Sequence, residues 1–155
     1  MTLYFAYGSN MSRALMRRRC PTAQEIGRAV LPGVRLLIND DGYATLVPAA
    51  GGRIEGVLWR LAPRDRAALN AYERTDVGLY RAVAMTVRAA GGRHCRALVY
   101  VARSRRAGRP RPGYMALVVG AAREVGLPEP YVAALARIAP TGFTGARPRE
   151  IGEIA

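Results

Sequence analysis

Residues 4–11 read Tyr4-Phe5-Ala6-Tyr7-Gly8-Ser9-Asn10-Met11 and are the most informative stretch of the chain. The aromatic residues before Gly8 favour a β-strand, and glycine adopts backbone angles that other residues avoid. Ser9 and Asn10 are residue types that cap helices. The stretch therefore predicts a short strand that stops at Gly8 and opens into a helix. An edge strand with an ordinary turn fits the same local pattern equally well.

A strand that leads into a helix exposes backbone N–H groups that have no acceptor within that helix. Together with the positive end of the helix dipole, such donors suit a carboxylate or a developing oxyanion. The backbone of Gly8, Ser9 and Asn10 is therefore a candidate anion-binding turn.

The bulk composition favours one folded domain, residues 1–155. A chain of 155 residues has the length of a single domain, and 50% hydrophobic residues argue against disorder. Cys20 and Cys95 lie far apart, and no Cys/His spacing indicates a metal site. Since no signal peptide and no membrane-length apolar run is seen, we expect a cytoplasmic protein without membrane contact.

The formal charge of +13 raises the question of nucleic-acid binding. All 24 basic residues are arginine, beside abundant alanine, glycine and proline, a pattern typical of GC-rich coding. The densest basic run, residues 103–111, contains no aromatic residues for base stacking. The charge therefore predicts a solvated arginine-rich surface, with at most weak steering of small acidic substrates.

The hydrophobic pattern predicts strands in the first two thirds of the chain and helices in the last third, which indicates an α+β fold. Pro48 should close one strand, and Gly51-Gly52 should turn the chain. The expected strands, after the opening one, are residues 29–39, 43–47, 54–61, 80–88 and 94–102, and the expected helices are residues 12–19, 63–74, 114–125 and 131–138.

Two side chains are candidates for catalysis. Glu73 ends a short amphipathic helix among apolar and aromatic residues, which would raise its pKa to a value useful for proton transfer. A solvated glutamate paired with Arg74 is the alternative. Ser9 as a nucleophile would need a base, and the single histidine, His94, has no orienting acid nearby in sequence. The pattern GxSxG is also absent, which argues against a serine hydrolase.

Several ordered blocks resemble the gamma-glutamylcyclotransferase family over nearly the whole chain. The opening motif resembles the family's glycine-serine-asparagine loop, and the segment Leu69-Asn70-Ala71-Tyr72-Glu73 resembles the one that holds the family's catalytic glutamate. The other matching blocks are Tyr43-Ala44-Thr45-Leu46, Glu55-Gly56-Val57-Leu58-Trp59, Gly78-Leu79-Tyr80, Pro112-Gly113-Tyr114, Gly126-Leu127-Pro128 and the segment from Ile138 to Gly145.

The chain departs from the family pattern at three places. Met11 stands where the family usually has leucine. Asn70 replaces an aspartate that often lies three residues before the glutamate, and Arg74 replaces a glycine that often follows it. The carboxylate itself is retained.

The resemblance implies an enzyme that releases an amino acid or amine from a γ-glutamyl compound and forms 5-oxoproline. The substrate's own α-amine attacks its γ-carbonyl, so the enzyme needs no nucleophile, metal or cofactor. Glu73 would act as base and then as acid. The implied substrate-binding residues are Tyr7, Gly8, Ser9, Asn10, Met11, Tyr80 and Tyr114, although each tyrosine is equally compatible with a core role.

By the same resemblance the fold is a small closed barrel of mixed, largely antiparallel strands with surrounding helices. The expected partner is a small γ-glutamyl substrate, with no nucleic acid, and the expected state is a monomer or homodimer. The alternatives within enzymes are a γ-glutamyl-amine cyclotransferase or a biosynthetic relative that removes a γ-glutamyl group. The alternative of another class is a non-catalytic module that binds a ligand or nucleic acid.

Overall fold

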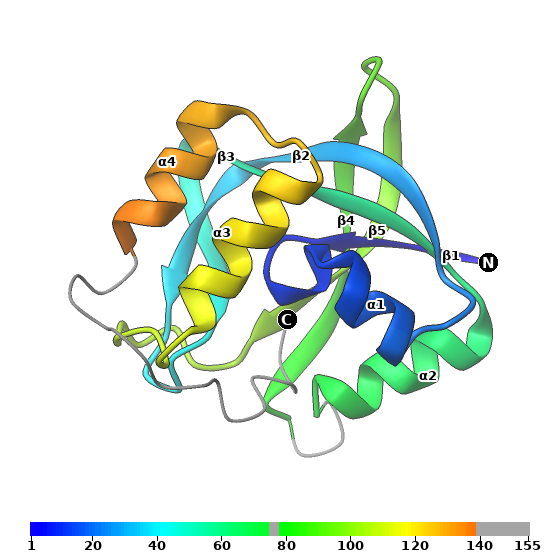
Figure 1. Cartoon of the computed structure of the whole chain (residues 1–155), viewed down its shortest axis with the longest axis horizontal. Coiled ribbons are helices and arrows are strands. Elements are labelled where there is room, and N and C mark those ends of the chain that lie inside the picture. Colours follow the sequence, from blue (N-terminus) through cyan, green and yellow to red (C-terminus); the bar gives the residue numbers. More distant parts are fainter. Residues whose placement is uncertain (75–77, 139–155) are drawn as a thin grey trace.

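In the computed structural model, which describes residues 1–74 and 78–138, a closed β-barrel is covered by helices (Figure 1). The strand order is β1-β3-β2-β4-β5. The barrel closes through a parallel pairing of β1 with β5, and the other pairings are antiparallel. This confirms the predicted α+β fold with a mixed, largely antiparallel barrel. The strands are β1 (Thr2–Ala6), β2 (Gln24–Ile38), β3 (Ala44–Leu61), β4 (Tyr80–Ala89) and β5 (His94–Ala102).

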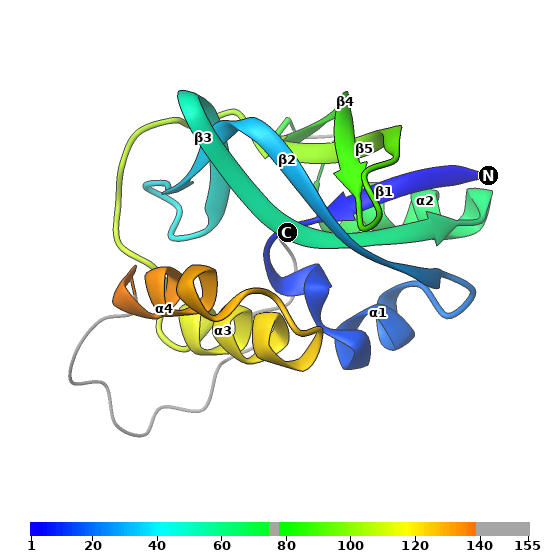
Figure 2. The same cartoon turned by 90° about the horizontal axis from the view of Figure 1, so that it is seen from above.

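Short helices connect and cover the strands. Figure 2 shows α1, α3 and α4 in one layer on the same side of the barrel. No helix in residues 1–74 and 78–138 is long and apolar enough to cross a membrane. The part of the family-like segment that follows Ile138 lies outside the described residues. The helices are the 3-10 turn η1 (Ser9–Met11), α1 (Arg13–Arg19), α2 (Pro63–Tyr72), α3 (Tyr114–Glu124) and α4 (Glu129–Ile138).

The opening strand β1 is central to the barrel. It pairs with β3 on one side and with β5 on the other, and Tyr4, Phe5 and Ala6 are almost fully buried. A closed barrel has no edge strand, so the alternative of an edge strand with an ordinary turn is wrong. Because β1 ends at Ala6, the turn at Gly8 begins where the chain leaves the barrel core.

The predicted break at Pro48 and Gly51-Gly52 is wrong, since β3 runs without interruption from Ala44 to Leu61. Pro48 pairs with Val34 of β2, and the register shifts between Pro32 and Val34. Such a β-bulge bends and twists a strand without ending its pairing. The proline and the two glycines therefore curve a long β2–β3 hairpin around the barrel instead of separating two strands (Figure 2).

The predicted capping by Ser9 and Asn10 is also wrong. A short 3-10 turn with Gly8 as its N-cap stands between β1 and α1, and it contains Ser9 and Asn10. The cap of α1 is Ser12, whose Oγ accepts a hydrogen bond from the amide of Leu15 at 3.3 Å. The chain thus uses two successive helix starts, and only the second carries a side-chain cap.

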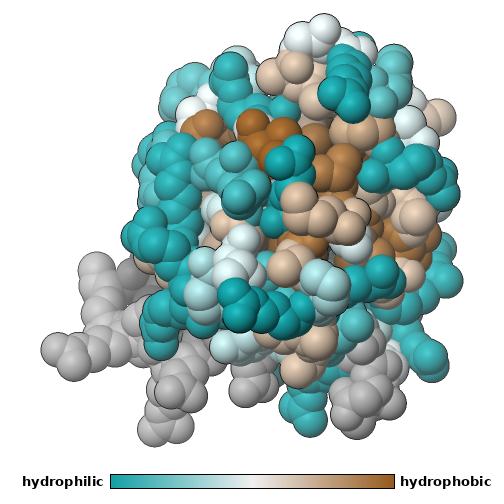
Figure 3. Space-filling view, turned by 90° about the vertical axis from the view of Figure 1, so that its right-hand side faces the viewer, coloured by the Kyte–Doolittle hydropathy of each residue, from teal (hydrophilic) through white to brown (hydrophobic). Residues whose placement is uncertain are grey.

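The surface mixes apolar and polar side chains. On the face seen in Figure 3, hydrophobic residues (brown) interrupt the hydrophilic ones (teal). Among the described residues the large hydrophobic side chains that stay exposed are those of Met1 and Ile26. Almost all large apolar side chains of the described residues are therefore covered.

We expect Asp65→Ala to destabilise the fold by about 1–2 kcal/mol. Asp65 is 1% exposed, and its Oδ2 accepts hydrogen bonds from the Ala62 amide at 3.0 Å and the Thr22 hydroxyl at 2.7 Å. The carboxylate thus caps the start of α2 and ties that start to the loop before β2. Thermal unfolding of the variant beside Asp41→Ala, an exposed loop control, measures the effect. Equal melting temperatures for both variants would contradict the capping role.

Candidate active site

Glu73 is buried at the carboxyl end of α2. Pro63 begins this helix, and the Glu73 amide donates to the carbonyl of Leu69 at 2.8 Å. Residues four apart share one face of a helix, and both Leu69 and Glu73 are 0% exposed. Because α2 packs with this face inward, the carboxylate lies inside the protein, and the alternative of a solvated helix-end glutamate is wrong.

Five buried tyrosines from different parts of the fold surround this carboxylate: Tyr4, Tyr7, Tyr80, Tyr100 and Tyr114. Burial is the main cause that raises the pKa of each phenol, and the negative charge of Glu73 raises it further. All five therefore lie within electrostatic range of Glu73. With pKa values raised above the ordinary value of 10.0, these phenols remain protonated and uncharged at neutral pH.

Hydrogen bonds to backbone groups fix three of these rings. The Tyr7 hydroxyl donates to the Tyr100 carbonyl at 2.6 Å, and the Tyr80 hydroxyl donates to the Ala44 carbonyl at 2.9 Å. The Tyr114 hydroxyl accepts from the Ala44 amide at 3.3 Å. The start of β3 thus holds both Tyr80 and Tyr114. The predicted residues Tyr7, Tyr80 and Tyr114 are brought together with Glu73.

The opening turn is fastened to the same region through Asn10. The side-chain amide of Asn10 donates to the Tyr4 hydroxyl at 3.0 Å. The backbone carbonyl of Asn10 accepts from the indole N–H of Trp59 at 3.1 Å. Ser9 and Asn10 are both 0% exposed. Gly8, with φ −120° and ψ −133°, lies outside the helical and extended regions. The turn is therefore a rigid element at the end of β1.

The amides of this turn are arranged as in any helix start. The Met11 amide donates to the Gly8 carbonyl at 3.1 Å, and the Ser12 amide donates to the Ser9 carbonyl at 3.0 Å. These two bonds close the 3-10 turn of residues 9–11 at the end of β1. The Met11 side chain, in contrast, is part of the hydrophobic core, so its contribution is packing.

The sequence analysis missed Tyr4, Tyr100 and Arg19. Arg19 ends α1 and is 5% exposed. Its guanidinium donates to Asn10 Oδ1 and to Ser9 Oγ, and it lies 5.0 Å from the centre of the Tyr72 ring. The spacing of three residues from the buried Met16 places Arg19 on the inner face of α1, a signal that the sequence contained.

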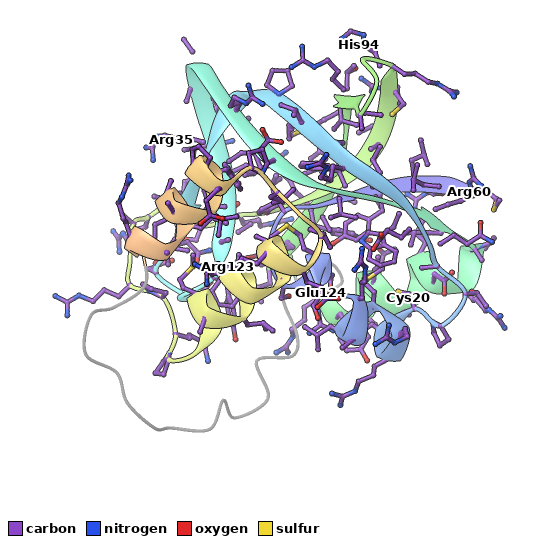
Figure 4. The ribbon with its side chains drawn as sticks, turned by 45° about the horizontal axis from the view of Figure 1, so that its top comes forward. Cys20, Arg35, Arg60, His94, Arg123 and Glu124 are labelled. Carbon is purple, nitrogen blue, oxygen red and sulfur yellow. The ribbon has the colours of Figure 1, made fainter. Side chains whose placement is uncertain are left out.

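His94 lies far from this cluster. It is exposed at the tip of the β4–β5 hairpin, and Figure 4 shows it well apart from Cys20, which follows Arg19 at the end of α1. A general base must lie within hydrogen-bond reach of the proton that it takes, so His94 cannot activate Ser9. Burial raises the pKa of the Cys20 thiol to about 12, which keeps it protonated and makes packing its role.

The rest of the described molecule offers no comparable constellation. Within residues 1–74 and 78–138, no three His, Cys, Asp or Glu side chains come together as metal ligands would. A groove of about 440 Å³ lies on the barrel wall and shares no residue with the cluster around Glu73. It is lined by Arg28, Ala29, Val30, Arg53, Glu55, Arg88, Ala89, Ala90, Gly91, Gly92 and Pro128.

Comparison with known proteins agrees with this architecture. The model of the family described as "Gamma-glutamyl cyclotransferase, AIG2-like" matches residues 4–116, which include the opening turn, Glu73 and all five tyrosines. The chain belongs to this family. The resemblance that the motifs indicated is thereby confirmed.

Relatives and solved structures extend the family match to nearly the full chain. The human protein named gamma-glutamylcyclotransferase is 28% identical over 98% of this chain and 86% of its own length. The bovine protein of the same name has the same identity and coverage. A solved structure titled "Gamma-glutamyl cyclotransferase" superposes with a TM-score of 0.87 at 28% identity and covers 97% of this chain and 95% of its own.

The residue that follows Glu73 has an unfavourable backbone conformation. Arg74, where the family often has glycine, has φ +52°, and it is the one non-glycine residue with positive φ in the described part of the chain. The left-handed conformation costs a residue with a Cβ roughly 1–2 kcal/mol. The sequence of this family member therefore accepts backbone strain directly beside Glu73.

We expect Arg74→Gly to stabilise the protein by about 0.5–1 kcal/mol, because glycine takes this conformation without the steric cost. Arg66→Gly, at an exposed position inside α2, is the matched control and should destabilise by about 1 kcal/mol. Chemical denaturation of both variants measures the two shifts. Loss of stability in both would show that the side chain of Arg74 outweighs its backbone strain.

Proposed function

We propose that the protein is a γ-glutamylcyclotransferase that converts a γ-glutamyl amino acid into 5-oxoproline and the free amino acid, with Glu73 as its general base and acid. The observation that carries this proposal is the fully buried carboxylate of Glu73, enclosed by neutral tyrosines beside the turn of residues 8–11. The chain's family supports the reaction class.

The reaction is an internal acyl transfer. The substrate's α-amine nitrogen attacks its own γ-carbonyl carbon, and a new C–N bond closes the five-membered ring. The bond from this carbon to the leaving nitrogen then breaks, and the leaving nitrogen takes up a proton. The protein has to hold the substrate folded so that amine and carbonyl meet, which is a proximity effect.

One carboxylate can accept protons from the attacking nitrogen and deliver them to the leaving nitrogen. The α-amine is an ammonium group in the free substrate, and it must lose a proton before it attacks. Glu73 accepts that proton and returns it to the leaving nitrogen. The attacking nitrogen carries a second surplus proton after the C–N bond has formed; the same carboxylate takes it up and passes it to the released amine, which leaves as an ammonium group, so that Glu73 ends the cycle in the form in which it began. A single base and acid is sufficient, so the reaction needs no histidine beside Glu73.

The neighbouring groups have complementary tasks in this proposal. The tetrahedral intermediate carries an oxyanion, and the amides of the turn at Gly8, Ser9 and Asn10 supply donors for it. Tyr7, Tyr80 and Tyr114 form the walls that position the substrate. Their hydroxyls are neutral, so the ionised Glu73 meets no competing negative charge from them.

Release of 5-oxoproline from a panel of substrates tests the function. The panel contains γ-glutamyl amino acids, glutathione and γ-glutamyl amines, and the product is detected by mass spectrometry. We expect release from at least one γ-glutamyl amino acid. The N-acetylated form of the best substrate is the matched control, because it lacks the attacking amine and should yield nothing. Preference for an amine would identify a γ-glutamyl-amine cyclotransferase, and no release from any member would overturn the proposal.

A further inference from the structure

Arg19 differs from the arginines around it. It is the last of the run Arg17-Arg18-Arg19, and it is buried while Arg17 and Arg18 are exposed. A buried arginine is rare unless its charge and its donors have partners. The contacts of Arg19 therefore indicate what this buried charge serves.

These contacts join the two halves of the candidate active site. One terminal nitrogen of the guanidinium donates to Asn10 Oδ1 and lies 3.4 Å from Ser9 Oγ, both in the opening turn. The guanidinium carbon lies 5.0 Å from the ring centre of Tyr72, the residue before Glu73. Arg19 thus contacts side chains of the turn whose backbone amides are the proposed oxyanion donors, and it contacts the end of the helix that carries the proposed base.

Arg19 and Glu73 also interact through their charges. Burial lowers the pKa of the Arg19 guanidinium, and the negative charge of Glu73 is the largest influence that raises it again. By the same interaction, the cation favours the ionised form of Glu73. Among the described residues, the phenols of Tyr4, Tyr7, Tyr80, Tyr100 and Tyr114 also interact with the charge of Glu73, which raises their pKa values.

We propose that Arg19 is a positioning residue of the active site, which holds the turn of residues 8–11 against the end of α2 and supplies the positive charge that balances the buried carboxylate of Glu73. The inference rests on the proposed function, because an ionised Glu73 is what allows the catalytic cycle to begin with proton abstraction. Burial among aromatic rings disfavours the carboxylate, and Arg19 offsets this effect without contacting the reacting atoms.

The pH at which Glu73 titrates tests the electrostatic part directly. Side-chain carboxyl carbons of ¹³C-labelled glutamate are followed by NMR, and the resonance that is missing in Glu73→Gln identifies Glu73. We expect Arg19→Gln, which can still bond to Asn10 but carries no charge, to make Glu73 titrate about 1–3 pH units higher. Arg19→Lys should restore the titration, and Arg18→Gln is the exposed control. An unchanged titration in Arg19→Gln would overturn the proposal.

The kinetics test the positioning part. In Arg19→Gln, the acidic limb of the pH profile of kcat/KM should move to higher pH, and the rate at neutral pH should fall about 100-fold. Arg19→Lys should keep the limb in place but lose rate, because an ammonium cannot reproduce the planar guanidinium contacts. If Arg19→Gln does not fold, wild-type rates in Arg19→Lys would overturn the proposal, and reduced rates beside an unaffected Arg18→Lys would support it.

The proposed function and the proposed role of Arg19 are tested independently of each other. The NMR titration needs no substrate, so it judges the coupling of Arg19 to Glu73 even if no panel compound reacts. The substrate panel uses the wild-type protein, so it judges the function whatever Arg19 does.

Discussion

Replacement of Glu73 by glutamine is expected to lower kcat for 5-oxoproline release by roughly 10²–10⁴-fold, the usual contribution of a general acid–base group. Glutamine keeps the size of the side chain and can occupy the same space at the end of α2. It cannot accept the proton of the substrate ammonium, so the amine stays unreactive. The position is 0% exposed, and solvent water is therefore a poor substitute for the missing base.

The variant also separates catalysis from binding. Substrate affinity, measured by calorimetry with a non-reacting N-acetylated analogue, should change little, because the proposed contacts of the turn and the tyrosines remain. Glu124→Gln is the matched control, since Glu124 lies on the surface at the end of α3 (Figure 4) and should keep full activity. A fully active Glu73→Gln variant would exclude Glu73 as the base.

Replacement of Gly56 by alanine is expected to destabilise the protein by about 3 kcal/mol, the upper part of the range for overpacked cores. Gly56 lies in β3, beside the end of β1. A Cβ at this position would overlap the carbonyl oxygen of Ala6 and lie 2.7 Å from the ring of Phe5. The strand β1 is buried between two neighbours and has no room to move away.

The same change should reach the candidate active site, because Ala6 immediately precedes Tyr7 and the turn at Gly8. We expect the melting temperature to fall and the remaining folded protein to lose activity. Gly120→Ala is the matched control: it lies in α3 with no atom within 4 Å of the added Cβ, and it should stabilise by about 0.5–1 kcal/mol. Equal stability of Gly56→Ala and wild type would contradict the packing argument.

Local sequence patterns were sufficient for most of the secondary structure. The strand β5 was predicted with the bounds that the structure has, and β4 was predicted to within one residue. Alternation and turn residues act over a few positions, so they are readable without the fold. The prediction of a strand end at Pro48 was wrong, because the same residue types occur at strand ends and at β-bulges. Only the pairing with β2 distinguishes the two cases.

The residues of the candidate site were also predicted only in part. The motif of residues 4–11 and Glu73 were found from the sequence and the family resemblance. The place of Tyr4 in the site was not predicted, and neither were Tyr100 and Arg19. Tyr100 and Arg19 stand in stretches without a motif. They come into range of Glu73 through the closure of the barrel by β1 and β5 and through the packing of α1 on the opening turn.

The sequence by itself determined the kinds of element, the turn chemistry and the carboxylate, because these depend on neighbours along the chain. The tertiary structure decided the environment of that carboxylate. Glu73 in isolation reads as a solvated helix end, and it becomes a buried group only when β1, β4, β5, α1 and α3 bring five tyrosines and Arg19 around it. Burial and charge coupling depend on distances between segments far apart in the chain, and no local pattern specifies those distances.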